Sequence, residues 1–186
     1  MARAALPSPD VLHAILRYDA TTGRLYWKHR PREFFPSDSG YRTWNATFAG
    51  REALKTADKD GYLRGALFSR PVSAHWVIWA MHNGRWPAQE IDHINGNPQD
   101  NRIENLREAT RSQNSLNTRA RVGSKGVCWN KARRKWQVSI SINGKNTYLG
   151  LFDCKEAARA AYANAARMHH GAFFNVKDAP EATCQA

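Results

Sequence analysis

The feature that most constrains the fold of this chain is an Asn143-Gly144 pair between two runs of alternating residues. In residues 135–142 apolar side chains alternate with polar ones, so a strand there has one apolar and one polar face. An Asn-Gly pair between such runs is the strongest short-range signal of a β-hairpin. The sequence therefore predicts strands over 135–142 and 147–152, preceded by a third over 125–130.

A helix is predicted directly after this hairpin. Asp153 and Glu156 supply an acidic start, and Gly171 supplies a stop. Many alanines lie between these ends and allow the helix to approach a sheet closely. The side chains expected to be buried are Ala158, Ala161, Tyr162, Ala165 and Met168.

The first half of the chain gives less regular patterns. We expect, in chain order, a helix over 10–18, a strand over 24–28, loops over 31–59, a strand over 61–68 and a helix over 74–83. Ser73 is positioned to cap the last helix and Gly84 to end it. His75 lies within this apolar helix and is interpreted as a packing residue.

A polar segment between residues 92 and 114 carries the candidate chemistry. Asp92 and His93 are adjacent, and Asn105 and Asn114 follow His93 after 12 and 21 residues. Histidine can take a proton from water near neutral pH because its unperturbed pKa is about 6.5. The Asp92 carboxylate and the Asn114 amide oxygen suit a hard cation such as Mg²⁺ or Mn²⁺. A general base and one divalent metal are the minimum for hydrolysing a phosphodiester.

The local structure around this segment is predicted from the same residues. The expected elements are strands over 90–94 and 106–110 and a helix from Ser112. Neighbouring side chains on a strand point to opposite faces, so we expect a bulge or bend that re-aims either Asp92 or His93. The alternative is that these residues merely build turns, which accounts for Asn95-Gly96 but not for the Asp-His pair.

From Asp92 to Asn114 the chain resembles the HNH endonucleases of the phage and intron-encoded homing type, whose motif reads D-H-I-N-G-x-x-x-D-N-R-x-x-N-L-R. The resemblance implies a strand–strand–helix metal finger at about 88–119, with His93 as the catalytic general base. It implies that Asn105 ties the loop together and orients the base, and that Asp92 and Asn114 bind one Mg²⁺ or Mn²⁺. Asn114 replaces the final histidine of the motif, so no structural zinc is expected.

Residues 125–178 resemble the APETALA/ethylene-response-factor DNA-binding domain. The matching residues include Gly126-Val127, Lys135-Trp136 and Tyr148-Leu149-Gly150. The resemblance implies that the outer face of the sheet lies in the DNA major groove. The residues expected to contact DNA are Arg119, Arg121, Lys125, Lys131, Arg133, Arg134, Lys135, Ser139, Ser141 and Tyr148. Arginines that plant members use are replaced by smaller residues here, so their base preference does not transfer. The alternative is a sheet that merely packs on the nuclease core.

The distribution of charge favours a nucleic-acid partner over a membrane surface. The chain has a net charge of +12, with 13 Lys and Arg against 7 Asp and Glu in residues 1–89 and 11 against 3 in residues 120–178. Residues 90–119 carry 4 against 5, so basic arms flank a slightly acidic segment, as a cation site requires. Double-stranded DNA is the expected partner, and the oligomeric state is left open.

The cysteines and the hydropathy pattern bear on localisation. The 3 cysteines are widely spaced and form no C-x-x-C pair, which disfavours a disulfide framework and a zinc site. The sequence shows no membrane-spanning run or signal-peptide core. We therefore expect an intracellular, cytoplasmic protein, phage-encoded and acting in a bacterial host.

Together these patterns predict an α+β chain: a small N-terminal sheet and helices, a ββα-metal finger, then a three-stranded antiparallel sheet on one helix. The predicted parts are an HNH endonuclease domain at 1–119, a linker at 120–124, a DNA-binding domain at 125–178 and a tail at 179–186. The predicted function is that of a metal-dependent homing endonuclease, a hydrolase acting on ester bonds, targeted by its C-terminal module. The alternative is a non-catalytic DNA-binding regulator with a degenerate HNH fold.

Overall fold

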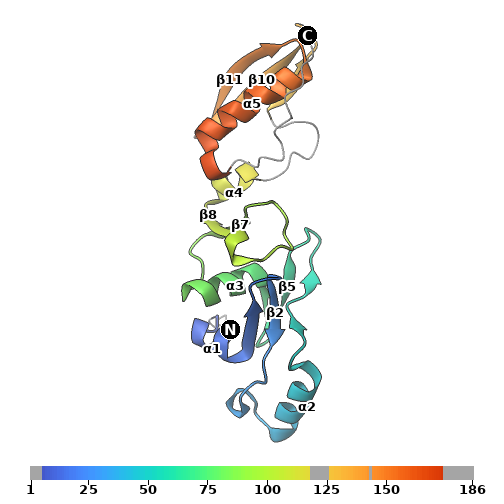
Figure 1. Cartoon of the computed structure of the whole chain (residues 1–186), viewed down its shortest axis with the longest axis vertical. Helices are drawn as coiled ribbons and strands as arrows, with labels where there is room; N and C mark the ends of the chain where they lie inside the picture. Colours follow the sequence, from blue (N-terminus) through green and yellow to red (C-terminus); the bar gives the residue numbers. More distant parts are fainter. Residues whose placement is uncertain (1–5, 118–125, 143, 174–186) are drawn as a thin grey trace, which may run out of the picture. The chain divides into compact units, whose positions relative to one another are not determined.

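The computed structural model describes residues 6–117, 126–142 and 144–173. Their contacts divide the chain into two compact units, Met1–Ala109 and Thr110–Ala186. Both units combine helices with small antiparallel sheets, so the α+β prediction is confirmed (Figure 1). This division by contacts precedes the linker expected at 120–124, which lies outside the described residues. The predicted domain limits remain a prediction.

The first unit is built from three small sheets and three helices among its described residues. Its elements are α1 (Pro9–Ile15), β1 (Leu16–Asp19), β2 (Arg24–Trp27), η1 (Arg32–Phe34), α2 (Asp38–Phe48), β3 (Glu52–Ala53), β4 (Thr56–Ala57), β5 (Leu63–Leu67), β6 (Arg70–Ser73), α3 (Ala74–Asn83), β7 (Glu90–His93), η2 (Ile103–Asn105) and β8 (Leu106–Ala109). The sheets have the orders β1–β2–β3, β4–β5–β6 and β7–β8.

Helix α3 forms the centre of this unit's core. It contacts α1, β5, β6 and η2, and Figure 1 shows it beside the β1–β2 hairpin. Val77 and Ile78 of α3 are fully buried together with Leu12 and Ile15 of α1. The helix ends at Gly84, whose φ of 66° is the left-handed conformation that glycine adopts without a steric cost. The predicted helix over 74–83 is confirmed.

Two predictions for the first unit are wrong. The helix expected over 10–18 ends at Ile15, because Leu16 enters β1 and pairs with Trp27 of β2. The segment expected to be loop-rich contains α2. Ser37 caps that helix by accepting a hydrogen bond from the Gly40 N–H (3.2 Å).

Helix α2 is fastened by a polar contact that hydrophobic periodicity does not reveal. Asn45, which is buried, accepts a hydrogen bond from the Arg30 N–H (2.8 Å) and donates one to the Arg30 carbonyl (3.1 Å). The amide of one side chain therefore replaces two backbone partners and ties α2 to the chain that leaves β2.

The second unit is a three-stranded antiparallel sheet on one long helix. Its described elements are α4 (Arg111–Asn117), β9 (Val127–Asn130), β10 (Lys135–Ile142), β11 (Lys145–Phe152), α5 (Lys155–His170) and η3 (Gly171–Phe173). The strand order is β11–β10–β9. Val138 and Ile140 of β10 and Ala158 of α5 are buried where the helix contacts the sheet.

Two details of α5 correct the sequence expectations. The cap is Cys154, whose Sγ accepts a hydrogen bond from the Ala157 N–H (3.3 Å), and not Asp153. Met168 is 82% exposed instead of buried. It lies two residues after the buried Ala166, and two residues carry a side chain about 200° around a helix.

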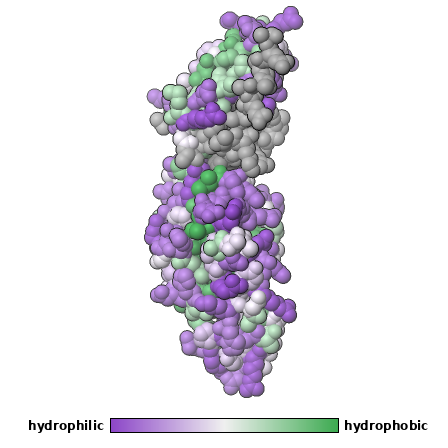
Figure 2. Space-filling view, viewed as in Figure 1, coloured by the Kyte–Doolittle hydropathy of each residue, from purple (hydrophilic) through white to green (hydrophobic). Residues whose placement is uncertain are grey.

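Hydrophilic residues predominate on the face drawn in Figure 2, and hydrophobic residues show there only as small patches. None of the helices in the described part of the chain is long and apolar enough to span a membrane.

Candidate active site

The paired strands β7 and β8 carry the Asp92-His93 pair. Their register is regular from Glu90 opposite Ala109 to His93 opposite Leu106, so the expected bulge is absent from this ladder. The two side chains consequently point to opposite faces. Each is only 4% exposed, and each finds a different partner.

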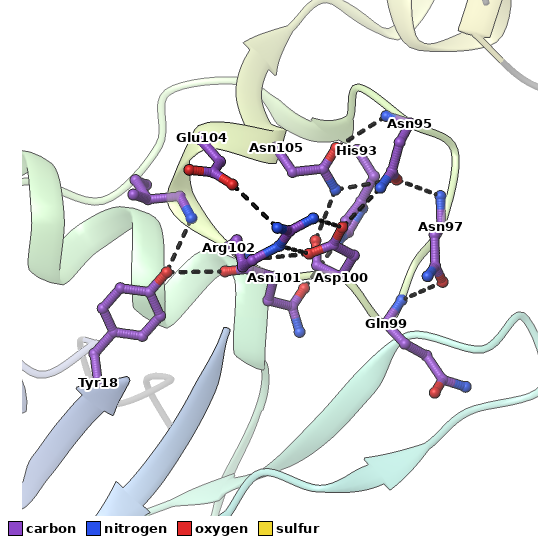
Figure 3. Close-up of polar contacts among 11 residues, drawn as sticks. Tyr18, His93, Asn95, Asn97, Gln99, Asp100, Asn101, Arg102, Glu104 and Asn105 are labelled. Carbon is purple, nitrogen blue, oxygen red and sulfur yellow. Dashed lines mark hydrogen bonds and ion pairs between the residues drawn. The ribbon is translucent and has the colours of Figure 1, made fainter. Parts of the chain in front are cut away.

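His93 is held by an asparagine of the following loop. Its Nε2 lies 2.8 Å from the Oδ1 of Asn101, which is itself fully buried (Figure 3). An amide oxygen only accepts hydrogen bonds, so the ring proton is on Nε2 and the basic lone pair is on Nδ1. Burial lowers the pKa of His93, while the bond to Asn101 and the charge of Asp92 oppose that shift. The imidazole is therefore neutral, and able to accept a proton, at neutral pH.

Two aromatic side chains enclose the His93 ring. The ring of His75 meets it edge to face with centroids 5.1 Å apart, and the ring of Tyr62 lies 5.7 Å away. Burial, with a smaller contribution from His93, lowers the pKa of His75 to about 3. His75 is thus a buried neutral packing residue, as interpreted from the sequence. Because it is neutral, it places no competing positive charge beside His93.

Asn105 ties the loop together, as the motif implies. Its Oδ1 accepts a hydrogen bond from the Asn95 N–H (2.9 Å), and its Nδ2 donates to the carbonyl of Asp100 (2.7 Å) and to Asn95 Oδ1 (3.1 Å) (Figure 3). The hydrogen bond to His93, however, is made by Asn101, which the sequence interpretation did not single out. Its position inside the matched D-N-R triplet was the available signal.

Asp100, the residue before Asn101, is held by an ion pair with Arg102. Asp100 accepts two hydrogen bonds from Arg102, Nε to Oδ1 and Nη2 to Oδ2, both 2.8 Å long. It also accepts one from Asn95 Nδ2 (2.7 Å). The Arg102 guanidinium, with help from Asn95, holds the pKa of Asp100 at about 2. The carboxylate is therefore ionised at neutral pH. It links Asn95, which precedes it in the loop, to Arg102, which follows it.

Residues of the N-terminal β1–β2 hairpin contact the backbone of this loop. The Tyr18 hydroxyl donates to the Asn101 carbonyl (3.3 Å) and accepts from the Ile103 N–H (2.9 Å) (Figure 3). Gly23, at φ 69°, packs so closely that a Cβ there would lie 2.6 Å from the Arg102 nitrogen. Glycine is required at that position both by its conformation and by the close approach of the loop backbone.

The proposed metal ligand Asp92 is paired with an arginine. Arg107 Nε and Nη2 lie 2.8 and 2.6 Å from Asp92 Oδ2. The described residues contain no group of three or more His, Cys, Asp or Glu side chains suited to a metal. Mg²⁺ is commonly bound by one or two protein oxygens, with water and substrate phosphate in its other positions. The carboxylate thus fits such an ion by its chemistry, although the ion would share it with Arg107.

Asn114, the second predicted ligand, lies on α4 in the second unit and is half-buried. The helix begins there because Thr110 and Gln113 form a capping box: Gln113 Oε1 accepts from the Thr110 N–H (2.9 Å), and Thr110 Oγ1 accepts from the Gln113 N–H (3.2 Å). Because Asp92 and Asn114 belong to different units, their shared metal site stays a prediction.

Several predicted DNA-contacting residues share one face of the second unit's sheet. Ser139 is opposite Tyr148 in the β10–β11 ladder, Ser141 occupies the same face, and Tyr148 is 58% exposed. Lys135 instead forms an ion pair with Asp153 (3.0 Å). The exposed cations of the β9–β10 turn are Lys131, Arg133 and Arg134. The remaining predicted contacts, Arg119, Arg121 and Lys125, lie outside the described residues.

Comparison with known proteins bears on the same region. Residues 72–116 match the HNH endonuclease family. The chain is also 31% identical over 107 residues to protein 3.8 of Escherichia phage T7, an alignment that covers 55% of this chain and 88% of that protein. No solved structure matches the chain significantly. The chain therefore belongs to the family of phage T7 protein 3.8, and its residues 72–116 form an HNH endonuclease domain.

Proposed function

We propose that this protein is a homing-type DNA endonuclease that cuts double-stranded DNA with His93 as general base and one Mg²⁺ or Mn²⁺ on Asp92 and Asn114. The HNH domain supports a nuclease acting on DNA. The observation that carries the assignment of the base is the buried bond between His93 Nε2 and Asn101 Oδ1. It leaves the basic lone pair on Nδ1, which is the form that proton abstraction needs.

In this mechanism the loop prepares the base before substrate arrives. Asn101 fixes the tautomer and orientation of His93, and Asn105 holds the loop that carries Asn101. His93 Nδ1 takes a proton from the attacking water, and burial of the ring disfavours the charged imidazolium until the substrate's phosphate approaches. The divalent ion, when bound, neutralises charge on the scissile phosphate. Arg107 holds the Asp92 carboxylate in one orientation beside that site.

We further propose that the second unit contacts DNA in the manner of an APETALA/ethylene-response-factor domain. Residues 120–178 carry 11 Lys and Arg against 3 Asp and Glu, which favours binding to phosphates. The face that carries Ser139, Ser141 and Tyr148 is directed away from α5, since Val138 and Ile140 occupy the other face. That face offers hydroxyl groups and one exposed ring to a DNA groove.

A cleavage assay on plasmid DNA tests the catalytic proposal. The substrate is a supercoiled plasmid that carries the DNA flanking this protein's gene, incubated with Mg²⁺, with Mn²⁺ or with excess chelator. We expect cutting at a defined position with either metal and none with chelator. Cleavage that persists in chelator contradicts the metal assignment. Specific binding without cleavage under every condition supports the non-catalytic regulator instead.

A further inference from the structure

A cavity of about 350 Å³ lies in the first unit, outside the matched HNH segment. It is formed where the chain leaves β2, where α2 ends, and at the turn between β5 and β6. Its volume falls within the range of about 300–1,000 Å³ that is usual for small-molecule sites. The side chains that matter for its chemistry are Trp27, Arg30, Trp44, Phe48, Phe68 and Ser69.

Arg30 is a buried cation that stacks on aromatic rings but forms no ion pair with any described residue. It is 7% exposed, and its guanidinium carbon lies 3.8 Å from the ring centroid of Trp44 and 4.5 Å from that of Trp27. Among the described residues it forms no ion pair, and its buried Nε has no hydrogen-bond acceptor. Burial lowers its pKa to about 10, so it remains charged at neutral pH. Donors left unsatisfied in this way are costly, and a ligand with acceptor atoms would satisfy them.

Two exposed rings stand at the mouth of the cavity. Phe48 is 41% exposed and Phe68 is 45% exposed. Phe68 and Ser69 have φ values of 50° and 64°, which are the left-handed conformations of a two-residue hairpin turn that Asn-Gly adopts more easily. The chain thus holds a large ring, half in solvent, at a position where its backbone is strained.

This lining suits a flat, neutral ligand with acceptors on its edge. Of the described residues that line the cavity, Arg30 alone is charged, and the faces of aromatic rings repel anions. A phosphate group would therefore bind weakly in this cavity. A nucleobase stacks on aromatic and guanidinium planes, and its edge acceptors accept N–H bonds from arginine, as O6 and N7 of guanine do.

We infer that this cavity binds one unpaired nucleobase of the nucleic-acid substrate, with Phe48, Phe68 and Trp44 contacting the base and Arg30 donating to its edge. The inference rests on the proposed nucleic-acid substrate, but it adds a site outside the HNH domain. Such a site favours DNA in which a base has left the stack, and so selects for local distortion in addition to sequence.

The test compares two duplexes that differ in one base. One contains a single bulged guanine, and the other contains an abasic residue in the same bulge, so their phosphate charge is identical. The full-length protein should bind the first about 5- to 100-fold more tightly, which corresponds to stacking of one base. Phe68→Asn, which suits the turn, should bring this ratio close to one without lowering the melting temperature by more than a few degrees. Arg30→Gln should also reduce the ratio.

Arg42→Gln is the matched control, because Arg42 is exposed on α2 and does not line the cavity. It should weaken binding to both duplexes equally and leave the ratio unchanged. Phe48→Leu keeps the apolar surface at the mouth but removes a ring, so it reports on stacking even if Arg30→Gln fails to fold.

Three outcomes would overturn the inference. These are equal affinity of the wild type for the two duplexes, an unchanged ratio in both phenylalanine variants, and an equal loss for both duplexes in Arg30→Gln, which would indicate phosphate binding. His93→Ala is expected to slow cleavage about 10²–10⁴-fold and to retain the wild-type ratio. Failure of the catalytic proposal is therefore distinguishable from failure of the base pocket.

Discussion

The polar side chains of the loop after β7 and those of the β9–β10–β11 face are arranged in opposite ways. In the loop, Asn101 and Asn105 are buried, and each fixes the orientation of the residue to which it is hydrogen-bonded. In the sheet, Ser141 and Tyr148 are exposed, and so are the cations Lys131 and Arg133 of the β9–β10 turn. Buried, mutually bonded groups act as a unit, whereas exposed cations act additively through their summed charge. We therefore expect single substitutions to have large effects in the loop and small ones on the sheet.

The largest effect is expected at the base itself. His93→Ala should reduce the cleavage rate about 10²–10⁴-fold, since that is the contribution typical of general-base catalysis. DNA affinity, measured by fluorescence anisotropy, should stay near the wild-type value. His82→Ala, an exposed histidine on α3, is the control and should cleave normally. Wild-type turnover in the His93 variant would remove it from the mechanism.

The second-largest effect on the cleavage rate is expected at Asn101, because it acts through His93. Asn101→Leu removes the acceptor and should slow cleavage about 10–100-fold, the usual cost of losing a group that orients a reactive side chain. Asn101→Asp keeps an acceptor and adds a negative charge that stabilises the imidazolium and raises the pKa of His93. Cleavage is lost as pH falls through that pKa, so the acidic limb of the pH–rate profile should move to higher pH. A slower rate with an unshifted limb would indicate a purely structural role.

Asp100 should contribute to stability more than to chemistry. Its folded-state pKa of about 2 lies below the ordinary value, so its contribution is present above about pH 4 and is lost as pH falls toward 2. Asp100→Asn should lower the free energy of unfolding by about 2 kcal/mol at pH 7, and by less at pH 3. Asp38→Asn is the control. Asp38 forms an ion pair with Arg32, but its side chain is 68% exposed, so its substitution should change stability little. Urea unfolding at the two pH values measures both.

The smallest effects are expected from substitutions in the β9–β10 turn of the second unit, and they concern DNA affinity. Lys131→Ala and Arg133→Ala remove exposed cations of the β9–β10 turn and should each weaken DNA binding only a few-fold. The slope of log affinity against log salt should become shallower by about 0.9 for each lost phosphate contact. Affinities at several salt concentrations test this. An unchanged slope in the double variant would mean that the turn does not reach DNA, and a loss as large as that of a loop variant would mean that the two regions are not organised differently.

Much of the fold was predictable because its signals are local. The Asn-Gly turn, the alternation over 135–142 and the Ser73 and Gly84 boundaries each occupy a few neighbouring residues. The strands that flank the Asn-Gly pair and helix α3 form where expected, because such signals act on the backbone beside them, although Ser73 makes no side-chain capping hydrogen bond.

The elements that escaped prediction depend on distant partners. Helix α2 presents few apolar residues to the core and is tied down by the hydrogen bonds of Asn45 to the Arg30 backbone. Leu16 resembles a continuation of α1 until its partner Trp27 is known. Within the candidate site, the motif points to His93 and Asn105, whose catalytic roles stay predictions. The contact of Asn101 with His93 depends on the folded loop and has no local signal of its own beyond its place in the motif.

The clamp formed by Tyr18 and Gly23 bears on how far the nuclease chemistry can be transplanted. Tyr18 bonds to backbone atoms 83 and 85 positions away, and both clamp residues lie outside the segment that matches the HNH family. A cassette cut to residues 72–116 would carry His93 and Asn105 into a new host protein without the hairpin beneath their loop. The smallest unit that keeps the HNH motif with this support accordingly starts near the N-terminus of the chain. Recombination between Gly23 and Asp92 would separate the motif from the hairpin residues that contact its loop.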